Sequence, residues 1–307
     1  MEGREFLDRL KEEIGKVVVG YEEVVELLAV GLLSGGHVIL EGVPGVAKTT
    51  LAKSFAKAVG LSFSRIQLTP DLMPADITGS VVYDPRNSSF YFKKGPIFAN
   101  VVLADEINRA MPKTQSALLE AMQEKQVTVE GKTYPLPDPF FLIATMNPVE
   151  SEGVYRLPEA QRDRFMLRLK MEYLEEDEEI IFLKRKVEPS NHEIAEIGAS
   201  IADLRNKARR VRVDEKIIKY VHSICSRTRY DKRVLLGASP RAMEQMIHAA
   251  KSLAFLEGRS YVIPDDIKLI SMYALPHRIL IKAEFEIDGL KPEDVIKEIL
   301  EEIEVPK

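Results

Sequence analysis

The hydrophobic pattern of the first two-thirds of the chain predicts strands that alternate with helices. Apolar residues recur at helical spacing over 22–33, which predicts a helix. Four short apolar runs are strand candidates, at 38–40, 63–68, 101–104 and 140–145. Because short buried strands between helices are typical of a parallel sheet with crossover connections, we predict an α/β fold.

The pattern changes near residue 172, beyond which helix signals dominate and strand signals are scarce. An acidic run at 175–179 is expected to form the solvated first turn of a helix. Later helix starts are marked by capping residues or by proline at the first helical position: Asp214, Ser239 with Pro240, Pro264 and Pro292. Since 307 residues suggest roughly two domains, we predict an α/β core domain over 1–172 and a small all-helical domain over 173–307.

Two β-hairpins are also predicted within the α/β part. Strand-forming residues flank short polar turns at 84–88 and 130–132. Contact with a substrate or partner is one interpretation of both segments, and ordinary packing hairpins are the alternative.

Composition narrows the class of protein. The net charge is −5 and the pI is about 5.7, so the chain has no overall basic footprint for nucleic acid. Its one cysteine, Cys225, cannot form an intramolecular disulfide, which favours a cytoplasmic location. We expect no signal peptide, because the first residues lack an apolar core, and no membrane insertion, because the longest apolar stretch is interrupted.

The clearest chemical signal is the glycine-rich segment 42–49, which separates a predicted strand from a predicted helix. This layout is that of a P-loop, in which backbone N–H groups and a helix N-terminus bind a polyphosphate. Lys48 is expected to reach the terminal phosphates of ATP, and the Thr49 hydroxyl to hold Mg²⁺. Ala47 stands where the consensus has its second fixed glycine, and we expect the loop to close there with a negative φ. A plain strand-to-helix turn is the alternative.

Polar residues also end two further predicted strands. Asp105 and Glu106 follow the run 101–104, which is the expected place of a second nucleotide motif. Asp105 is expected to orient Mg²⁺ through water, and Glu106 to polarise the water that attacks the γ-phosphate. Asn147, just past another strand, is expected to orient that water or to contact the γ-phosphate. A surface Asp-Glu pair and an Asn-Pro turn are the structural alternatives.

Two arginines complete the candidate chemistry. Arg164 is our choice for an arginine that one subunit presents to the site of the next, with Arg162 as a close competitor; a structural salt bridge is the alternative for either. Arg241 follows Ser239 and Pro240 in the first turn of a predicted helix, where a cation opposes the helix dipole. This conflict suggests a phosphate partner, and a salt bridge to Glu244 or Glu41 is the alternative.

These motifs, in this order, resemble those of the AAA+ ATPases, and most closely the MoxR family of the helix-2-insert clade. The resemblance rests on the segments 42–49, 95–100, 105–110, 144–148, 157–165 and 239–241, and it spans about 18–280. It implies a P-loop core followed by a helical lid domain. It also implies a Walker A pair, a Walker B pair, sensor 1, an arginine finger and sensor 2, which would be Lys48 and Thr49, Asp105 and Glu106, Asn147, Arg164 and Arg241.

The same resemblance extends the set of nucleotide-binding residues. It implies that ATP is bound by Val19, Gly20, Gly42, Val43, Pro44, Gly45, Val46, Ala47, Lys48, Thr49, Thr50 and Asp105, with Mg²⁺ held by Thr49 and Asp105. One departure lies near the expected adenine pocket, where Tyr21 stands in a place that is often glutamine in the family. Since backbone contacts usually dominate there, we expect this departure to matter little.

The resemblance further implies a homo-oligomeric ring, usually hexameric, that hydrolyses ATP as a chaperone. Members of the family assemble or activate protein complexes, often by inserting metal cofactors, and are commonly encoded beside von Willebrand A-domain partners. In related rings, the two predicted hairpins point toward the axial channel. An arginine that acts in trans requires such neighbours, since it completes the site of another subunit.

Other functions stay open at this point. A DNA-remodelling or helicase-like AAA+ motor, or a magnesium-chelatase-like ATPase subunit, belongs to the same clade. The acidic net charge and the lack of an appended DNA-binding module make nucleic acid an unlikely partner. A nucleotide-gated binding switch that hydrolyses little is a third hypothesis, although such a switch has no need of Glu106 or Arg164.

Overall fold

The computed structural model describes residues 1–148, 155–187 and 193–306. Its centre is a parallel sheet of five strands in the order β2-β5-β8-β1-β9. The strands are β1 (Val38–Gly42), β2 (Phe63–Gln67), β5 (Val101–Asp105), β8 (Phe141–Met146) and β9 (Leu167–Met171). The α/β fold and the four predicted strands are therefore confirmed, and β9 is a fifth strand that no prediction covers.

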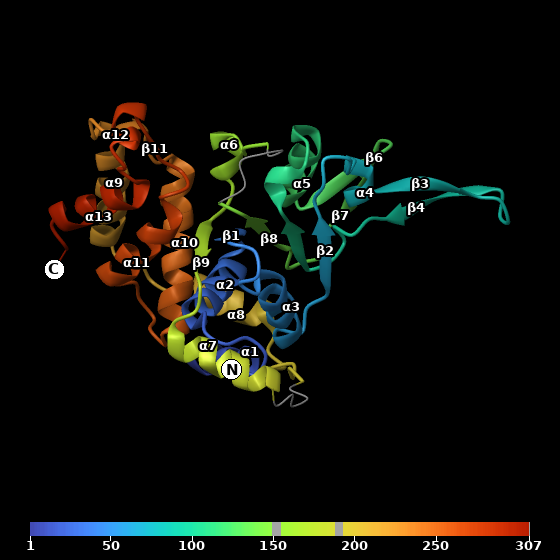
Figure 1. Ribbon diagram of the computed structural model, residues 1–307, viewed down its shortest axis with the longest axis horizontal. Coiled ribbons are helices and arrows are strands. Elements are labelled where there is room, and N and C mark those ends of the chain that lie inside the picture. Colours follow the sequence, from blue (N-terminus) through green and yellow to red (C-terminus); the bar gives the residue numbers. More distant parts are fainter. Residues whose placement is uncertain (149–154, 188–192, 307) are drawn as a thin grey trace.

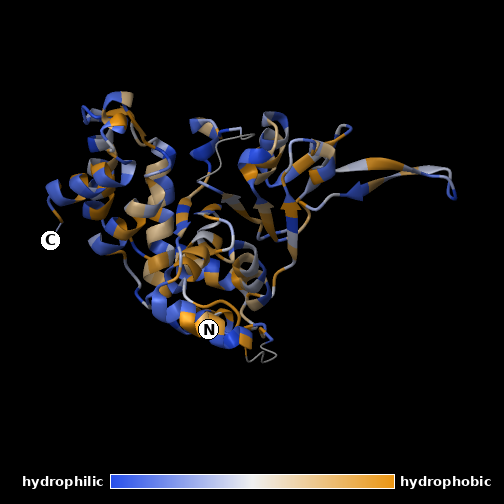
Figure 2. Ribbon diagram, viewed as in Figure 1, coloured by the Kyte–Doolittle hydropathy of each residue, from blue (hydrophilic) through white to orange (hydrophobic). Residues whose placement is uncertain are grey.

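Helices cover both faces of this sheet (Figure 1). Because strand residues alternate between faces, Val38 and Leu40 of β1 pack into one hydrophobic cluster while Ile39 packs into the other. The first cluster includes α2 (Glu22–Ser34) and α3 (Lys48–Ala58), which α1 (Gly3–Gly15) contacts. The second includes α5 (Pro112–Glu124). In Figure 2 the central strands are strongly hydrophobic, as expected of a sheet covered on both sides.

Both predicted hairpins form. The first, β3 (Gly79–Asp84) with β4 (Ser89–Lys94), follows α4 (Pro74–Thr78) and projects far from the body of the molecule (Figure 1). The second is β6 (Gln126–Val129) with β7 (Lys132–Pro135). Phe92 and Tyr134 stack with ring centroids 4.0 Å apart, so the two hairpins touch at the base of the projection.

The chain beyond β9 is helical as predicted, except for two short strands that pair with each other and that the all-helical prediction did not include. Its elements are α7 (Glu176–Val187), α8 (Ile201–Arg209), α9 (Glu215–Tyr230), β10 (Val234–Leu236), α10 (Pro240–Leu256), α11 (Pro264–Ala274), β11 (Leu280–Ile281), α12 (Ala283–Ile287) and α13 (Pro292–Glu302). Two short helices precede β9 in the chain: η1 (Ile107–Arg109) and α6 (Glu159–Arg162). The caps act as expected: Asp214 accepts a hydrogen bond from the Lys216 N–H, and Ser239 accepts one from the Ala242 N–H.

The helical part shares its core with the sheet part. Helices α8 and α10 pack against α2, and α11 packs against β9. One hydrophobic cluster accordingly contains Leu28 of α2, Leu204 of α8 and Ala250 of α10. The division near residue 172 stays a prediction. Within the described ranges, no helix is long and apolar enough to cross a membrane.

A buried histidine at the start of β1 makes a testable prediction about acid stability. Nδ1 of His37 accepts the Leu142 N–H (3.0 Å), and Nε2 lies 3.2 Å from the Met122 carbonyl, which fits the neutral ring. Burial lowers the pKa of His37 to about 3, whereas the unfolded chain takes up the proton near pH 6.5. Stability from the neutral ring is therefore present above pH 6.5 and is lost as the pH falls toward 3.

We expect the His37→Gln variant to lose stability less steeply than the parent between pH 6 and pH 5. The parent slope should be steeper by up to about 1.4 kcal/mol per pH unit, the value for one proton bound only by the unfolded state. Urea unfolding at pH 7, 6 and 5 measures this, with His222→Gln, at an exposed position, as the matched control. Equal slopes for the parent and His37→Gln would contradict the assignment.

Candidate active site

The glycine-rich segment forms the connection between β1 and α3, as a P-loop does. Gly45 has a φ of 93°, and a Cβ on Gly42 would lie 2.4 Å from the Met171 carbonyl oxygen, so both positions require glycine. Ala47 is the N-cap of α3 and has a φ of 61°. The expected negative φ is therefore wrong: the chain turns into α3 at Ala47 itself, in the left-handed conformation that the consensus glycine adopts without strain.

The strain at Ala47 gives a prediction about stability. Ala47→Gly should raise the free energy of unfolding by up to about 1 kcal/mol, because glycine removes the Cβ from a left-handed position. Ala47→Val should lower it, since a β-branched residue is a true outlier there. Thermal unfolding of the two variants measures the effect. If Ala47→Val were more stable than Ala47→Gly, the left-handed conformation of Ala47 would be contradicted.

Lys48 and Thr49 open α3 at the end of the loop. The Lys48 ammonium donates to the carbonyl oxygens of Gly42 and of Val43, the latter at 3.2 Å, so the side chain lies back over the loop. The Thr49 hydroxyl lies 3.5 Å from Oδ2 of Asp105, at the end of the strand β5. Residues from two elements that are far apart in the sequence thus meet beside the loop.

Thr145 contacts both acidic residues at the end of β5. Its hydroxyl donates to Oδ1 of Asp105 (2.6 Å) and accepts the Glu106 N–H (2.8 Å). Glu106 has a φ of 60°, a rare conformation for a non-glycine residue. Since strain of this kind persists only where the surroundings hold it, Thr145 on the strand β8 helps to hold the Glu106 backbone in this conformation.

The strand β2 supplies partners for both carboxylates. Arg65 donates two hydrogen bonds to Oδ2 of Asp105, at 2.6 and 3.0 Å, and a third to Gln67. Gln67 in turn donates to Oε2 of Glu106 (2.8 Å), which Arg109 also approaches at 3.2 Å. Sequence reasoning missed Arg65 and Gln67; their spacing of two, which puts both on one face of a predicted strand, was the available signal.

The predicted catalytic residues of the sheet line one cavity of about 350 Å³. It lies at the carboxyl ends of β1, β5 and β8, where ligands bind in open α/β sheets. Its lining consists of Pro44, Gly45, Ala47, Lys48, Thr49, Thr50, Asp105, Glu106 and Asn147. The cavity therefore combines a cation and a helix N-terminus, which favour an anion, with two carboxylates and an amide.

A second, apolar cavity of about 380 Å³ adjoins the same loop. It shares Pro44, Gly45 and Ala47 with the first, and its other walls come from the segment before α2 and from the chain around α7. These walls are Val17, Val18, Val19, Tyr21, Tyr173, Leu174, Glu179, Phe182 and Leu183, and Val46 of the loop completes the lining. Two adjoining cavities, one charged and one apolar, match the two ends of a nucleotide.

Predicted residues of the second cavity are only partly in place. Val19 lines it, whereas Gly20 lines a neighbouring hollow that faces α7. Tyr21 also lines the apolar cavity, and its hydroxyl donates to the Glu172 carbonyl oxygen at 2.7 Å. That contact joins the segment before α2 to the chain after β9. No role for the Tyr21 side chain was predicted from the sequence.

The three candidate arginines line neither cavity. Arg164 donates to the Leu119 carbonyl oxygen of α5 at 2.9 Å, and Arg162 pairs with Glu159 at 3.2 Å. Arg241 is half-buried and forms neither of the ion pairs considered for it. Glu41 pairs instead with Arg168 (3.4 Å), and Glu244 lies 3.8 Å from His248.

Two known family models match parts of this chain. Residues 37–167 match the model of the ATPase family associated with various cellular activities (AAA). Residues 226–299 match the AAA lid domain. The first match contains the cavity at the strand ends, and the second contains most of the helical part.

Similar proteins cover nearly the whole chain. The protein YeaC of Bacillus subtilis is 45% identical over 98% of this chain and 95% of its own length. The chaperone MoxR1 of Mycobacterium tuberculosis is 44% identical over 98% and 82%. A crystal structure of a candidate ATPase from Cytophaga hutchinsonii superposes with a TM-score of 0.93, at 41% identity over 99% and 96%. The chain therefore belongs to the MoxR family of AAA+ ATPases and is an ATP-hydrolysing enzyme.

Proposed function

We propose that this ATPase works as a ring-forming chaperone and that its chemistry takes place in the cavity at the carboxyl ends of β1, β5 and β8. The observation that carries the site is the meeting of Lys48, Thr49, Asp105, Glu106 and Asn147 around this cavity. The proposed roles are phosphate binding for Lys48, metal binding for Thr49 and Asp105, and activation and orientation of water for Glu106 and Asn147. The adjoining apolar cavity would take the adenine, with Val19 and Tyr21 on its wall.

The position of Glu106 supports its role with water. Gln67 and Arg109 both contact Oε2, and no described residue donates a hydrogen bond to Oε1, so Oε1 is available to accept one from a water that faces the γ-phosphate. Thr145 holds the backbone of the same residue. The side chain is thus oriented before ATP binds, which is the main contribution a general base of this class makes.

The residues present fit a magnesium ion. Within the described ranges, no cluster of three or more His, Cys, Asp or Glu could form an all-protein cage. Mg²⁺ needs no such cage, because it keeps several waters and takes substrate phosphates as ligands. The Thr49 hydroxyl and Oδ2 of Asp105 lie together, and this same oxygen already accepts hydrogen bonds from the Arg65 cation. When bound, Mg²⁺ would neutralise charge on the β- and γ-phosphates.

Because Arg65 and Mg²⁺ would share Oδ2 of Asp105, we expect the two cations to compete. Arg65→Met should lower the Mg²⁺ concentration needed for half-maximal binding of a fluorescent ADP by roughly 3- to 10-fold, since one charge-assisted contact is lost. A Mg²⁺ titration measures this, with Arg86→Met on the exposed hairpin as control. A higher Mg²⁺ requirement would show that Arg65 assists the metal instead.

The ring assembly is proposed because the site is incomplete in one subunit. Arg164 lines neither cavity of its own chain, so it would act on a neighbour, and a hexamer is the expected closed assembly. Arg241, near the start of α10, is proposed as the lid residue that contacts a phosphate; like Arg164, it lines neither cavity of its own chain, so it too would act on a neighbouring site. The helical lid domain would span 173–307.

The chaperone role comes from the resemblance to MoxR1. We propose that clients are protein complexes to be assembled, activated or loaded with metal cofactors, with a von Willebrand A-domain partner and a cytoplasmic location. The exposed aromatics of the first hairpin, Tyr83, Phe90 and Tyr91, support a protein-binding role, since such side chains are enriched at interfaces.

ATPase stimulation separates this proposal from a DNA motor. We expect a permanently unfolded polypeptide to raise the ATPase rate, and we expect the triple alanine variant of Tyr83, Phe90 and Tyr91 to lose this response but to keep its basal rate. Double- and single-stranded DNA should leave the rate unchanged between 50 and 200 mM salt. Salt-sensitive stimulation by DNA would instead favour the DNA-remodelling alternative.

A further inference from the structure

A buried arginine joins the lid to the segment that carries Arg164. Arg278 follows α11, and its side chain is 1% exposed. It donates to the carbonyl oxygens of Ala274 (2.6 Å), Phe165 (2.6 Å), Met166 (3.2 Å) and Asp163 (3.2 Å), and to the side chain of Gln245. Nε also donates to Oδ1 of Asp163, at 3.1 Å. Three backbone carbonyls of the four-residue segment 163–166, between α6 and β9, are therefore tied to one side chain of the lid.

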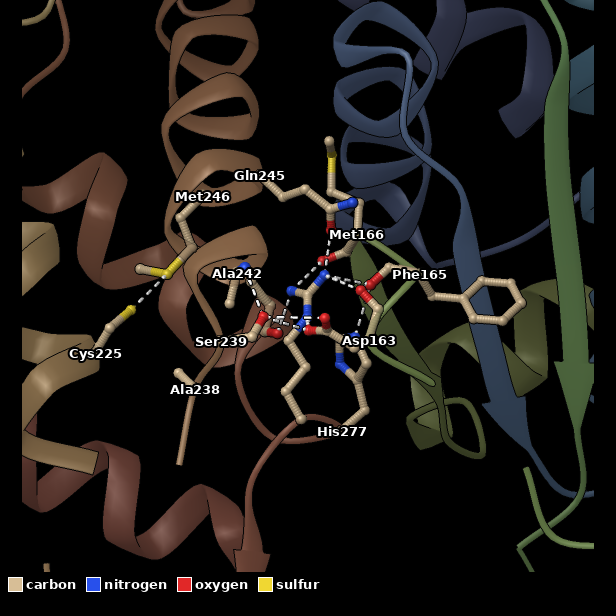
Figure 3. A network of polar contacts seen from close by, with 12 residues as sticks. Asp163, Phe165, Met166, Cys225, Ala238, Ser239, Ala242, Gln245, Met246 and His277 are labelled. Carbon is tan, nitrogen blue, oxygen red and sulfur yellow. Dashed lines mark hydrogen bonds and ion pairs between the residues drawn. The ribbon is translucent and has the colours of Figure 1, made fainter. Parts of the chain in front are cut away.

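The same carboxylate also binds the start of α10. The Ser239 hydroxyl lies 2.8 and 3.0 Å from the two oxygens of Asp163, while it caps α10 through the Ala242 N–H. Figure 3 shows Asp163 between Ser239 on the α10 side and the strand that continues from Phe165. Asp163 immediately precedes Arg164, and Ser239 lies two residues before Arg241. One carboxylate thus anchors both proposed arginine sites.

The ion pair between Arg278 and Asp163 is costly to break because Arg278 is buried. A buried guanidinium needs a counter-charge, and Asp163 is the carboxylate that contacts Arg278. Burial lowers the pKa of Arg278 to about 10, whereas Asp163 acts to raise it, so the cation persists at neutral pH. His277 reinforces the junction through Nε2, 2.8 Å from the Phe165 carbonyl oxygen, and its pKa lies well below the usual value because it is buried.

We propose that Asp163 and Arg278 are positioning residues that clamp the Arg164 segment to the lid, so that Arg164 and Arg241 move as one unit. This inference rests on the proposed roles of the two arginines. Helix α7 of the helical part lines the apolar cavity of its own chain. A shift of the lid when that cavity is filled would then move the arginines offered to the next site. The clamp thereby couples neighbouring sites around the ring.

Mixing of subunits tests whether Asp163 acts through Arg164. A Glu106→Gln subunit cannot hydrolyse ATP but offers an intact Arg164, whereas an Arg164→Ala subunit has an intact site but offers no arginine. We expect Asp163→Asn to bind ATP normally and to lose roughly 10- to 100-fold in kcat, because misplaced catalytic groups cost this much. Activity should be regained with Glu106→Gln subunits and not with Arg164→Ala subunits.

Two further variants control this test. Asp231→Asn removes a carboxylate from another buried pair of the lid, with Arg233 (2.8 Å), and should keep the parent kcat. Ser239→Gly removes one contact to Asp163 at a position where glycine is tolerated as an N-cap, and should lower kcat about 3-fold with the same mixing pattern. If Asp163→Asn does not fold, this milder variant decides, and an unchanged kcat overturns the clamp.

Hydrogen exchange supplies a readout that a merely structural residue would not move. In the parent, nucleotide binding should change amide exchange both at the start of α10 and over 159–166, whereas in Asp163→Asn it should change only the former. The proposal would be overturned if Arg164→Ala subunits restored the activity of Asp163→Asn. It would also be overturned if nucleotide binding to Asp163→Asn still changed amide exchange over 159–166. If Arg164→Ala itself is not rescued by Glu106→Gln, the trans mechanism fails, and the exchange result still tests the clamp.

Discussion

Replacing Lys48 with alanine is expected to weaken ATP binding by roughly 100-fold or more, because a cation is lost from the cavity that receives the phosphates. In the structure the ammonium is held over the loop by the carbonyl oxygens of Gly42 and Val43. It therefore needs little reorganisation to meet an anion between the loop and α3. Titration with a fluorescent ATP analogue measures the loss directly.

Lys53→Ala is the matched control, since Lys53 is an exposed lysine of the same helix. It should bind ATP like the parent. Tight binding by Lys48→Ala would refute the P-loop assignment, and the cavity at the ends of β1, β5 and β8 would then need another ligand.

Replacing Arg164 with alanine is expected to preserve ATP binding and to lower kcat by about 1000-fold, the lower end of the range for arginine fingers. The reason is geometric: Arg164 contacts the Leu119 carbonyl oxygen and lines neither cavity of its own chain, so it would serve a neighbouring site. Arg162→Ala is the matched control. Its side chain is committed to Glu159, and kcat should fall far less.

Mixed rings test this trans action. Arg164→Ala and Glu106→Gln subunits are each expected to be nearly inactive alone and to regain part of the activity together. No gain on mixing, once mixed rings are shown to form, would contradict the assignment of Arg164. A large loss of kcat in Arg162→Ala with little loss in Arg164→Ala would assign the trans-acting role to Arg162.

Much of the fold and of the site could be predicted because the signals are local. The apolar runs of β1, β5 and β8 are short and continuous, and each ends in a polar motif. Parallel strands bring their carboxyl ends to one edge, so Lys48, Asp105 and Asn147 could be expected to converge. The start of α10 could also be predicted, since Ser239 and Pro240 form a standard signal for the N-terminus of a helix.

The remainder depends on contacts between distant segments. Arg65 and Gln67 acquire meaning only once β2 is known to lie beside β5, and strand order cannot be deduced from one sequence. Likewise, β9 alternates basic and apolar residues and pairs with β1. It was not predicted, because the sequence on either side of it has the pattern of loops. The left-handed conformation of Ala47 was missed because alanine itself does not favour it.

If the site is completed only between subunits, specific ATPase activity should depend on protein concentration. The assay would contain Mg²⁺ and would be run alongside light scattering to measure mass. We expect activity per subunit to rise as a ring-sized species replaces the monomer. Activity that stays constant across concentration, from a species that remains monomeric, would contradict catalysis by Arg164 in trans.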